Sequence, residues 1–410
     1  MSDALNDGPL TGVRVLELGS TVAGPFCGRL LGDFGAEVIK VEVAEGDTVR
    51  SMGKRLNGRS LYAASIFRNK HLISIDLRLP EGQEVVRKLV RSCDVIVENF
   101  RPGALERWNL GYQDLSRINP ALVMVRISGF GQTGPYAERP GFGVIGEALS
   151  GLRHITGDPD RPPARVAVSL TDYVTGLYGA FGAVMAILAQ RQTGRGQFVD
   201  TALYEAAFSF MEPHIMAYDK LGHVAGRAGS RLPDNVPNNL YPTADKAFIH
   251  IAAISNSLFR RLAALMGRND LANDVRFLSG VDRAAHADEL DAIIAEWTAT
   301  HDLEALEQLL QTANVPASRI YTMADIFRDA HFQARGAIVD VADTELGSIK
   351  MANVVPRLSE TPGRVRHAGS GTVGGDTSEV LHRVAGLSPA EIDRLVAAGV
   401  IACASREVQT

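Results

Sequence analysis

The stretch VRVLELGSTVAGPFCGRLLGDFGAEVIKVE (Val13–Glu42) decides the fold. Its first six residues, VRVLEL (Val13–Leu18), form an apolar run typical of a buried strand, and EVIKVE (Glu37–Glu42) is a second such run. Between them, a turn that contains glycine and proline leads into an apolar segment, which predicts a helix over Phe26–Phe34. Strand, helix and strand in this order predict two parallel strands joined by a crossover helix.

The same alternation continues along the chain. Glu81–Ser92 carries apolar residues at helical spacing, and the strand-like runs DVIVEN (Asp94–Asn99) and LVMVRIS (Leu122–Ser128) follow it. We therefore predict an α/β fold with a large, doubly wound, Rossmann-like sheet. In such sheets ligands lie beyond the carboxyl ends of the strands, and we expect the site there.

The length of 410 residues is too great for one ordinary hydrophobic core and suggests two domains. Lys220–Pro242 is rich in Gly, Pro and Asn, which indicates a long loop. We expect residues 1–224 to form the N-terminal part of the large domain and residues 225–321 to form a smaller α+β domain. Residues 322–410 are expected to return and complete the large domain.

The composition is that of an ordinary globular protein. Its 46% hydrophobic and 22% charged residues and its net charge of −5 indicate neither nucleic-acid nor membrane binding. Cys27, Cys93 and Cys403 form no CxxC pair, which favours a reducing compartment over a disulfide framework. The opening MSDALNDGPL lacks the basic and apolar regions of a secretory signal, and we expect a cytoplasmic protein.

Three motifs suited to binding or catalysis lie between Val97 and Ala180. They are VENFRPG (Val97–Gly103), SGFGQTGPY (Ser128–Tyr136) and SLTDYVTGLYGA (Ser169–Ala180). Each joins a short polar or glycine-rich element to an apolar segment, and α/β enzymes build their sites at such junctions.

The second motif contains G-x-G-x-x-G (Gly129, Gly131 and Gly134) directly after a predicted strand. A dinucleotide fingerprint requires a helix to open at its last glycine, so that helical N–H groups hold the pyrophosphate. Here Pro135 and Tyr136 follow at once, and no helix can run through that sequence. The motif therefore predicts a loop that lines a site rather than a nicotinamide-cofactor site.

Asp172 stands at the head of the apolar segment Tyr173–Ala189. We expect this segment to be a buried core helix rather than a membrane span, because it contains Thr175 and three glycines. Asp is a favoured N-cap residue, so capping explains the position of Asp172 as well as catalysis does. The two roles are compatible, since a helix N-terminus stabilises an ionised carboxylate that can act as a nucleophile.

In this order the three motifs resemble those of the family III CoA-transferases, the group that contains formyl-CoA transferase and carnitine CoA-transferase. Pro9–Glu42 is similar to the opening of the family, RNKHLISIDL (Arg68–Leu77) and TGRGQFVDTAL (Thr193–Leu203) to internal elements, and GGDTSEVL (Gly374–Leu381) to the tail. The resemblance implies an enzyme that moves coenzyme A between carboxylic acids. It also implies acyl-CoA and an acid as substrates, no permanently bound cofactor and no metal, and a homodimer of two interlocked ring-shaped chains.

The resemblance further implies roles for individual residues, with Asp172 as the nucleophile. The substrate or oxyanion loop would use Gly129, Gly131, Gln132, Gly134 and Tyr136. The residues that match CoA contacts are Val22, Lys40, Asn69, Lys70, Asn99, Phe100, Arg101 and Arg107. CoA brings phosphates, which require cations and backbone donors.

Two departures from formyl-CoA transferase narrow the substrate. That enzyme carries a glutamine where this chain has Val22, and a run of glycines where this chain reads PDNVPNNLYPTAD (Pro233–Asp245). Formate and oxalate are therefore disfavoured. The chain resembles instead the members that move CoA from succinyl-CoA to itaconate, citramalate, mesaconate or glutarate, with itaconate as our first choice. A second carboxylate requires a cation, and the candidates in predicted loops are Arg50, Arg55, Arg165, Arg227 and Arg231.

Two alternatives remain from the sequence. The first is 2-methylacyl-CoA racemization on the same fold, but the acid–base His and Asp of the racemase would fall at Phe142 and Gly143, which cannot move an α-proton. The second is a catalytically silent CoA-binding protein, which would keep VENFRPG without needing Asp172.

Overall fold

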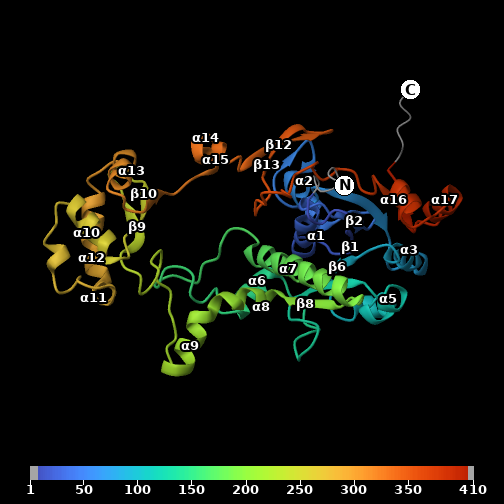
Figure 1. Cartoon of the computed structure of the whole chain (residues 1–410), viewed down its shortest axis with the longest axis horizontal. Coiled ribbons are helices and arrows are strands. Elements are labelled where there is room, and N and C mark those ends of the chain that lie inside the picture. The colour runs from blue at the N-terminus through green and yellow to red at the C-terminus, as the bar shows by residue number, and fades with distance from the viewer. Residues whose placement is uncertain (1–7, 405–410) are drawn as a thin grey trace. The chain divides into compact units, whose positions relative to one another are not determined.

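The computed structural model of the chain describes residues 8–404. Residues 1–7, on which the prediction about a secretory signal partly rests, and residues 405–410 lie outside the described residues. The chain divides into two compact units (Figure 1). The large unit takes the chain up to Leu152, Val166–Asp219 and the chain from Arg335 onward, and the small unit takes Arg153–Arg165 and Lys220–Ala334.

The small unit differs from the predicted domain in its boundaries. It begins at Lys220 rather than at residue 225, ends at Ala334 rather than at residue 321, and also includes Arg153–Arg165. This last segment joins it through an isolated antiparallel bridge between Gly157 and Gly229. Arg227 adds hydrogen bonds of 3.0 and 3.4 Å to the carbonyl oxygens of Asp158 and His154.

The large unit is built on a seven-stranded sheet with the order β14-β5-β2-β1-β6-β7-β8. All neighbouring strands are parallel except the last strand of the chain, β14, which pairs antiparallel with β5. The strands are β1 (Arg14–Glu17), β2 (Glu37–Glu42), β5 (Lys70–Ile75), β6 (Val95–Glu98), β7 (Val123–Ser128), β8 (Phe198–Ala202) and β14 (Ile401–Ala402). From β1 the chain adds β2 and β5 on one side and later β6, β7 and β8 on the other, so the strand order reverses between β1 and β6. Ligands of α/β sheets bind at such a point of reversal.

Helices cover both faces of this sheet, as the near-continuous apolar strands require. On β1, Val15 faces the core formed with α1 and α7, whereas Leu16 faces the core formed with α3, α5, α16 and α17. The helices of the large unit are α1 (Ala23–Asp33), α2 (Leu61–Ile66), α3 (Pro80–Val90), α4 (Ala104–Arg107), α5 (Tyr112–Ile118), α6 (Gly143–Leu149), α7 (Leu170–Thr193), α8 (Leu203–Phe208), α16 (Thr377–Arg383) and α17 (Pro389–Ala397). Helix α9 (Glu212–Leu221) crosses the boundary, and its last two residues belong to the small unit.

Two small hairpins complete the large unit. They are β3 (Arg55–Leu56) with β4 (Arg59–Ser60), and β12 (Ile338–Asp343) with β13 (Gly347–Ala352). A buried ion pair of 2.5 Å between Arg59 and Asp343 links the two hairpins.

Helix α7 is the longest helix described and lies along one face of the sheet beside α1 (Figure 1). Its glycines allow this close approach: a methyl group on Gly176 would lie 2.7 Å from the carbonyl oxygen of Ala23 on α1, and one on Gly182 would lie 2.6 Å from Val199 on β8. By length and composition α7 is the one helix among residues 8–404 that could cross a membrane. Its buried small residues, however, pack against the sheet and α1.

The small unit packs helices against a three-stranded antiparallel sheet with the order β11-β10-β9. Its strands are β9 (Asn238–Pro242), β10 (Phe248–Ala252) and β11 (Ala317–Arg319). Its helices are α10 (Asn256–Leu265), α11 (Gly280–Ala285), α12 (Ala287–Thr298), α13 (Leu303–Thr312), α14 (Met323–Arg328) and α15 (Ala330–Ala334). The predicted loop Lys220–Pro242 therefore ends in a strand, because the register of β9 buries Tyr241 against β10.

Candidate active site

Asp172 is the third residue of α7, and Ser169 occupies the N-cap position. Of the two roles left open by the sequence, N-capping therefore does not apply to Asp172, although its carboxylate lies in the first turn, where the helix dipole favours a negative charge. The residue is partly exposed. The first residue of α6, Gly143, lies directly against it: a methyl group on Gly143 would come within 2.1 Å of Oδ2. The absence of a side chain at residue 143 leaves room for the carboxylate.

Tyr173 follows Asp172 in α7 and is bonded to a second tyrosine, Tyr62 of α2. The Tyr173 hydroxyl donates a 2.9 Å hydrogen bond to the hydroxyl of Tyr62, and Phe26 packs edge-on against the Tyr173 ring at 4.7 Å. Burial, the bond to Tyr173 and the nearby charge of Asp172 raise the pKa of Tyr62, so its phenol stays neutral. The sequence did not single out Tyr62, because it carries no local motif and reaches the site only through the packing of α2.

The loop after β7 holds no helix before α6, as Pro135 predicted. Gly131 and Gly134 adopt left-handed backbone conformations, with φ of 89° and 90°. The Gly131 N–H donates to Ser128 Oγ at 3.0 Å, and the Gln132 N–H donates to Asp200 at 2.9 Å. These two N–H groups are therefore occupied within the protein and are not oxyanion donors in this conformation.

The other residues of this loop lie at its surface or pack within it. Gly129 packs against Gly141, since a methyl group on Gly129 would lie 2.9 Å from the Cα of Gly141. The Tyr136 ring is 40% exposed and stacks with the guanidinium of Arg139 at 3.6 Å. Tyr136 is thus available to a ligand.

A cavity of about 340 Å³ opens at the carboxyl ends of β1, β2 and β5 and beside the VENFRPG loop. Phe100 lines it, and its ring packs edge-on against Trp108, another lining residue, at 5.6 Å. Arg101 and Arg107 are exposed in and after the same loop, and neither forms an ion pair within residues 8–404. Asn99, at the start of the same loop, is partly exposed and is bonded to the backbone of Ser20. Of the matched CoA contacts, these four side chains are the ones at least partly open to a ligand.

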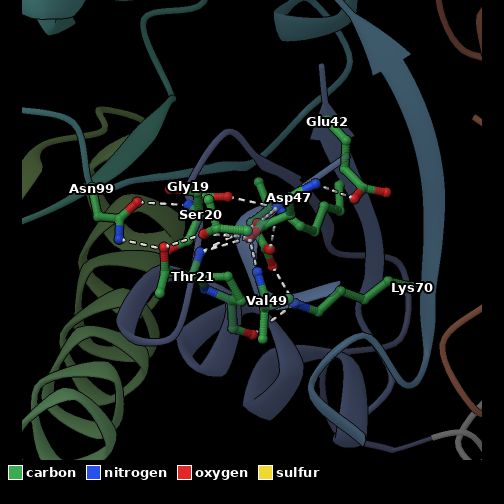
Figure 2. A network of polar contacts seen from close by, with 12 residues as sticks. Gly19, Ser20, Thr21, Glu42, Asp47, Val49, Lys70 and Asn99 are labelled. Atoms are coloured by element: carbon green, nitrogen blue, oxygen red, sulfur yellow. Dashed lines mark hydrogen bonds and ion pairs between the residues drawn. The ribbon is translucent and has the colours of Figure 1, made fainter. Parts of the chain in front are cut away.

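Lys40, Asn69 and Lys70 were expected to contact CoA, but the structure buries all three side chains. Lys40 Nζ is fully enclosed between Asp47 at 2.9 Å and the carbonyl oxygen of Gly19 at 2.6 Å. Lys70 Nζ is bound to Glu17 and to the carbonyl oxygen of Pro25, each at 2.6 Å (Figure 2).

Asn69 is likewise buried, and its amide donates to Asp33 at 2.7 Å. Val22 is 3% exposed and belongs to an apolar cluster. Direct contact of these four side chains with CoA is therefore not available in this structure. A lysine in a sequence gives no sign of whether it lies at the surface or in a buried ion pair.

Three of the five candidate arginines are also occupied. Arg50 forms a two-bond pair with Glu42 at 2.7 Å, Arg231 binds Asp291 at 2.6 Å, and Arg227 holds the carbonyl oxygens described above. Arg55 donates one long bond of 3.3 Å to the backbone, and Arg165 is exposed. The occupied arginines stabilise the protein itself.

Glu98, in the VENFRPG motif, is buried at the end of β6. Its carboxylate accepts from Arg126 and from the Phe100 N–H, each at 2.8 Å, so it fixes the start of the loop. Glu106 also pairs with Arg126, at 2.8 Å. Burial raises the pKa of Glu98 to about 7 against the opposing attraction of Arg126, whereas Arg126 holds the pKa of the more exposed Glu106 below its usual range in spite of partial burial.

We expect Glu98→Gln to gain stability relative to the wild type as the pH rises. Between the ordinary pKa of Glu and 7, native Glu98 binds more protons than unfolded Glu98, so its contribution to stability is present at low pH and is lost as the pH rises through this window. The free energy of unfolding of the variant minus that of the wild type should increase by on the order of 2–3 kcal/mol between pH 4.5 and 7.5. Urea denaturation at several pH values measures it.

The control is Glu106→Gln, whose difference from the wild type should change in the opposite direction, because the native pKa of Glu106 is lowered. Parallel stability curves for the wild type and Glu98→Gln would contradict the prediction.

Comparison with known proteins identifies the family of the chain. The family model described as CoA-transferase family III matches residues 10–377. The chain belongs to CoA-transferase family III. This CoA-transferase is 48% identical to the succinyl-CoA–D-citramalate CoA-transferase of Chloroflexus aurantiacus, and the match covers 96% of this chain and 98% of that protein.

A further relative and a solved structure are consistent with this family assignment. The beta subunit of the succinyl-CoA–L-malate CoA-transferase of Chloroflexus aurantiacus is 40% identical to this CoA-transferase, with 96% of this chain and 98% of that protein covered. The crystal structure of a CAIB/BAIF family protein from Brucella suis has a TM-score of 0.82 at 34% identity and covers 92% of this chain and 100% of that chain. The chain therefore shares its α/β fold, with the large and mostly parallel sheet, with this CAIB/BAIF family protein.

Proposed function

We propose that this enzyme moves CoA from succinyl-CoA to a small dicarboxylate, with citramalate as the first candidate acceptor. The observation that carries the proposal is the 48% identity, over nearly the full length of both chains, to a protein named for succinyl-CoA and D-citramalate. A second relative is named for succinyl-CoA and L-malate, also a short hydroxylated dicarboxylate. These names favour citramalate over itaconate, which was our first choice from the sequence.

In the proposed mechanism Asp172 is the nucleophile. Its carboxylate oxygen attacks the thioester carbonyl of succinyl-CoA, and expulsion of the CoA thiolate leaves a mixed anhydride between succinate and Asp172. The thiolate then attacks the Asp172 carbonyl, which releases succinate and forms an aspartyl-CoA thioester. The acceptor carboxylate attacks this thioester and frees the thiolate again, and the thiolate takes the acceptor acyl group from the second anhydride. Covalent catalysis of this kind divides one difficult exchange into steps of similar energy.

The surroundings of Asp172 suit this chemistry. Its place in the first turn of α7 favours the ionised, nucleophilic carboxylate. Each attack creates a tetrahedral oxyanion, which needs a hydrogen-bond donor close by. Tyr62 stays neutral, lies within the electrostatic reach of Asp172 and accepts its bond from Tyr173, so its own proton can serve as such a donor.

The proposal is tested with succinyl-CoA and a panel of acids: D- and L-citramalate, malate, itaconate, mesaconate, glutarate, acetate and carnitine. New CoA thioesters are followed by mass, and kcat/KM is measured for each acid against the one donor. We expect the highest kcat/KM for a four- or five-carbon dicarboxylate, with a citramalate enantiomer first. A preference for acetate or carnitine would remove the dicarboxylate assignment and leave the transferase activity in place.

A further inference from the structure

The turn Gly19–Val22 joins β1 to α1 at the point where the strand order reverses. Gly19 and Ser20 line the cavity beside Phe100, and Val22 packs in the cluster that includes Tyr62 and Tyr173, the neighbours of Asp172. The turn therefore connects the cavity with the surroundings of the nucleophile. Any displacement of its backbone changes both.

Thr21, within this turn, has φ of 68°. This left-handed conformation is unfavourable for a β-branched residue and persists only where neighbouring groups enforce it. Asp47 supplies the enforcing contact: its carboxylate accepts the Thr21 N–H at 3.0 and 3.2 Å, and the Thr21 hydroxyl meets that of Thr48 at 2.9 Å. Asp47 itself is held by Lys40 at 2.9 Å.

Three further side chains, those of Asn99, Lys40 and Lys70, bind the backbone on either side of Thr21 (Figure 2). Asn99 accepts the Ser20 N–H at 2.7 Å and donates to the Ser20 carbonyl oxygen at 2.9 Å. Lys40 donates to the carbonyl oxygen of Gly19, and Lys70 to that of Pro25 in the first turn of α1. Backbone groups from Gly19 to Pro25 are thus bound by side chains from β2, β5, the loop after β2 and the VENFRPG loop.

The charges in this group balance. Asp47, Glu17 and Glu42 face Lys40, Lys70 and Arg50, and the two lysines and Glu17 are completely buried. Burial alone would raise the pKa of Asp47, but Lys40 and the N–H groups of Val49 and Thr21 outweigh it and hold that pKa below its usual range. Asp47 is therefore ionised at neutral pH and accepts all these hydrogen bonds at once. Removal of its charge would leave Lys40 buried with a weaker partner.

We propose that Asp47, supported by Lys40, is a positioning residue for the acyl-CoA substrate: it holds Thr21 in its left-handed conformation and thereby sets the backbone wall of the cavity at the end of β1. This inference rests on the proposed CoA-transferase reaction, and it places CoA in the cavity that Gly19, Ser20 and Phe100 line. Lys40 was expected to contact CoA directly. In this inference it instead affects CoA binding indirectly, by holding Asp47 and the carbonyl oxygen of Gly19. Asp47 lies in no motif that the sequence singled out.

The test compares Asp47→Asn with the wild type. Asparagine keeps the size and one acceptor but loses the charge that binds Lys40. We expect the Kd of free CoA, measured by calorimetry, and the KM of succinyl-CoA to rise at least about tenfold, with kcat and the KM of the acceptor acid changed less than about threefold. The matched control is Asp343→Asn. Asp343, like Asp47, is an aspartate in a buried ion pair, but its partner is Arg59 and it lies in the β12–β13 hairpin. Its Kd for CoA should equal that of the wild type.

A second measurement separates positioning from general destabilisation. Glycine adopts a left-handed conformation without strain, so Thr21→Gly should make the turn depend less on Asp47. In a double-mutant cycle, the effect of Asp47→Asn on the Kd of CoA should fall below about threefold in the Thr21→Gly background. An equal effect in both backgrounds, an unchanged Kd in Asp47→Asn, or an equal rise in Asp343→Asn would overturn the inference.

Asn99→Ala provides a variant that buries no uncompensated charge if Asp47→Asn fails to fold. It removes both bonds to Ser20, and a raised Kd for CoA is again expected. Because Asn99 also matches a CoA contact, this rise should be smaller in the Thr21→Gly background if it arises through the turn. An unchanged Kd would overturn the inference. Because the Kd of CoA is measured without any acceptor, failure of the dicarboxylate panel leaves this test intact, and failure of this test leaves the panel result standing.

Discussion

We expect Asp172→Asn to lower the rate of CoA transfer by at least about a thousandfold while the protein keeps its fold. The amide has nearly the shape of the carboxylate, so the contact with Gly143 is preserved, but it cannot attack a thioester. Helix α7 does not depend on Asp172 as its N-cap, because Ser169 holds that position. Transfer from succinyl-CoA is measured by mass, and circular dichroism and thermal unfolding report the fold.

The control is Asp114→Asn, a surface aspartate of α5 paired with Arg117, which should keep wild-type transfer. Hydroxylamine or borohydride should modify residue 172 of the wild type only after exposure to acyl-CoA. If Asp172→Asn kept a tenth or more of the turnover, or if no adduct formed at residue 172, Asp172 would not be the nucleophile.

Gly143→Ala has the second largest expected effect, a fall in kcat of about 10- to 100-fold with a stable fold. The added methyl group would overlap Oδ2 of Asp172, and the group that must move is the end of a short, partly exposed side chain rather than backbone. The nucleophile therefore rotates away from its position while α6 and α7 stay in place. The KM of succinyl-CoA should change little, since neither Gly143 nor Asp172 lines the cavity proposed to hold CoA.

Gly375→Ala is the matched control, because the nearest atoms to its added methyl group lie at 3.8 Å, an ordinary contact distance. It should leave kcat unchanged. Wild-type kcat in Gly143→Ala would mean that the position of the carboxylate does not limit the reaction.

The central strands could be predicted because buried parallel strands are apolar on both faces. The runs at Val13–Leu18 and Glu37–Glu42 contain β1 and β2, and both strands have helices on each side. The helix after β1 begins at Ala23 rather than Phe26, since the predicted turn is shorter than its glycine and proline suggested. The extent of the small unit could not be predicted, because the bridge from Gly157 to Gly229 depends on a long-range contact with no local signal.

The site was predicted only in part, for a physical reason. Sequence indicates which residue types can do chemistry, and Asp172 next to a predicted helix was such a residue. It does not indicate burial, and for this reason Lys40 and Lys70, which are enclosed in ion pairs, looked the same as the exposed Arg101 and Arg107. Tyr62 and Asp47 form their hydrogen bonds with residues far away in the sequence, so neither belongs to a local motif.

The antiparallel strand β14 makes the order of synthesis matter for this protein. Ile401 pairs with Ile75, and Val380, Leu381 and Ile392 of the last two helices fill the same core as Leu16. Asp376 and Thr377 also accept backbone N–H groups of β5, from Leu72 and Ser74. A nascent chain therefore has an open edge at β5 and an incompletely covered apolar face until α16, α17 and β14 have been made, and these elements follow the small unit in the chain. Until then the unpaired edge of β5, whose Ile75 helps to line the cavity beside Phe100, can pair with another chain.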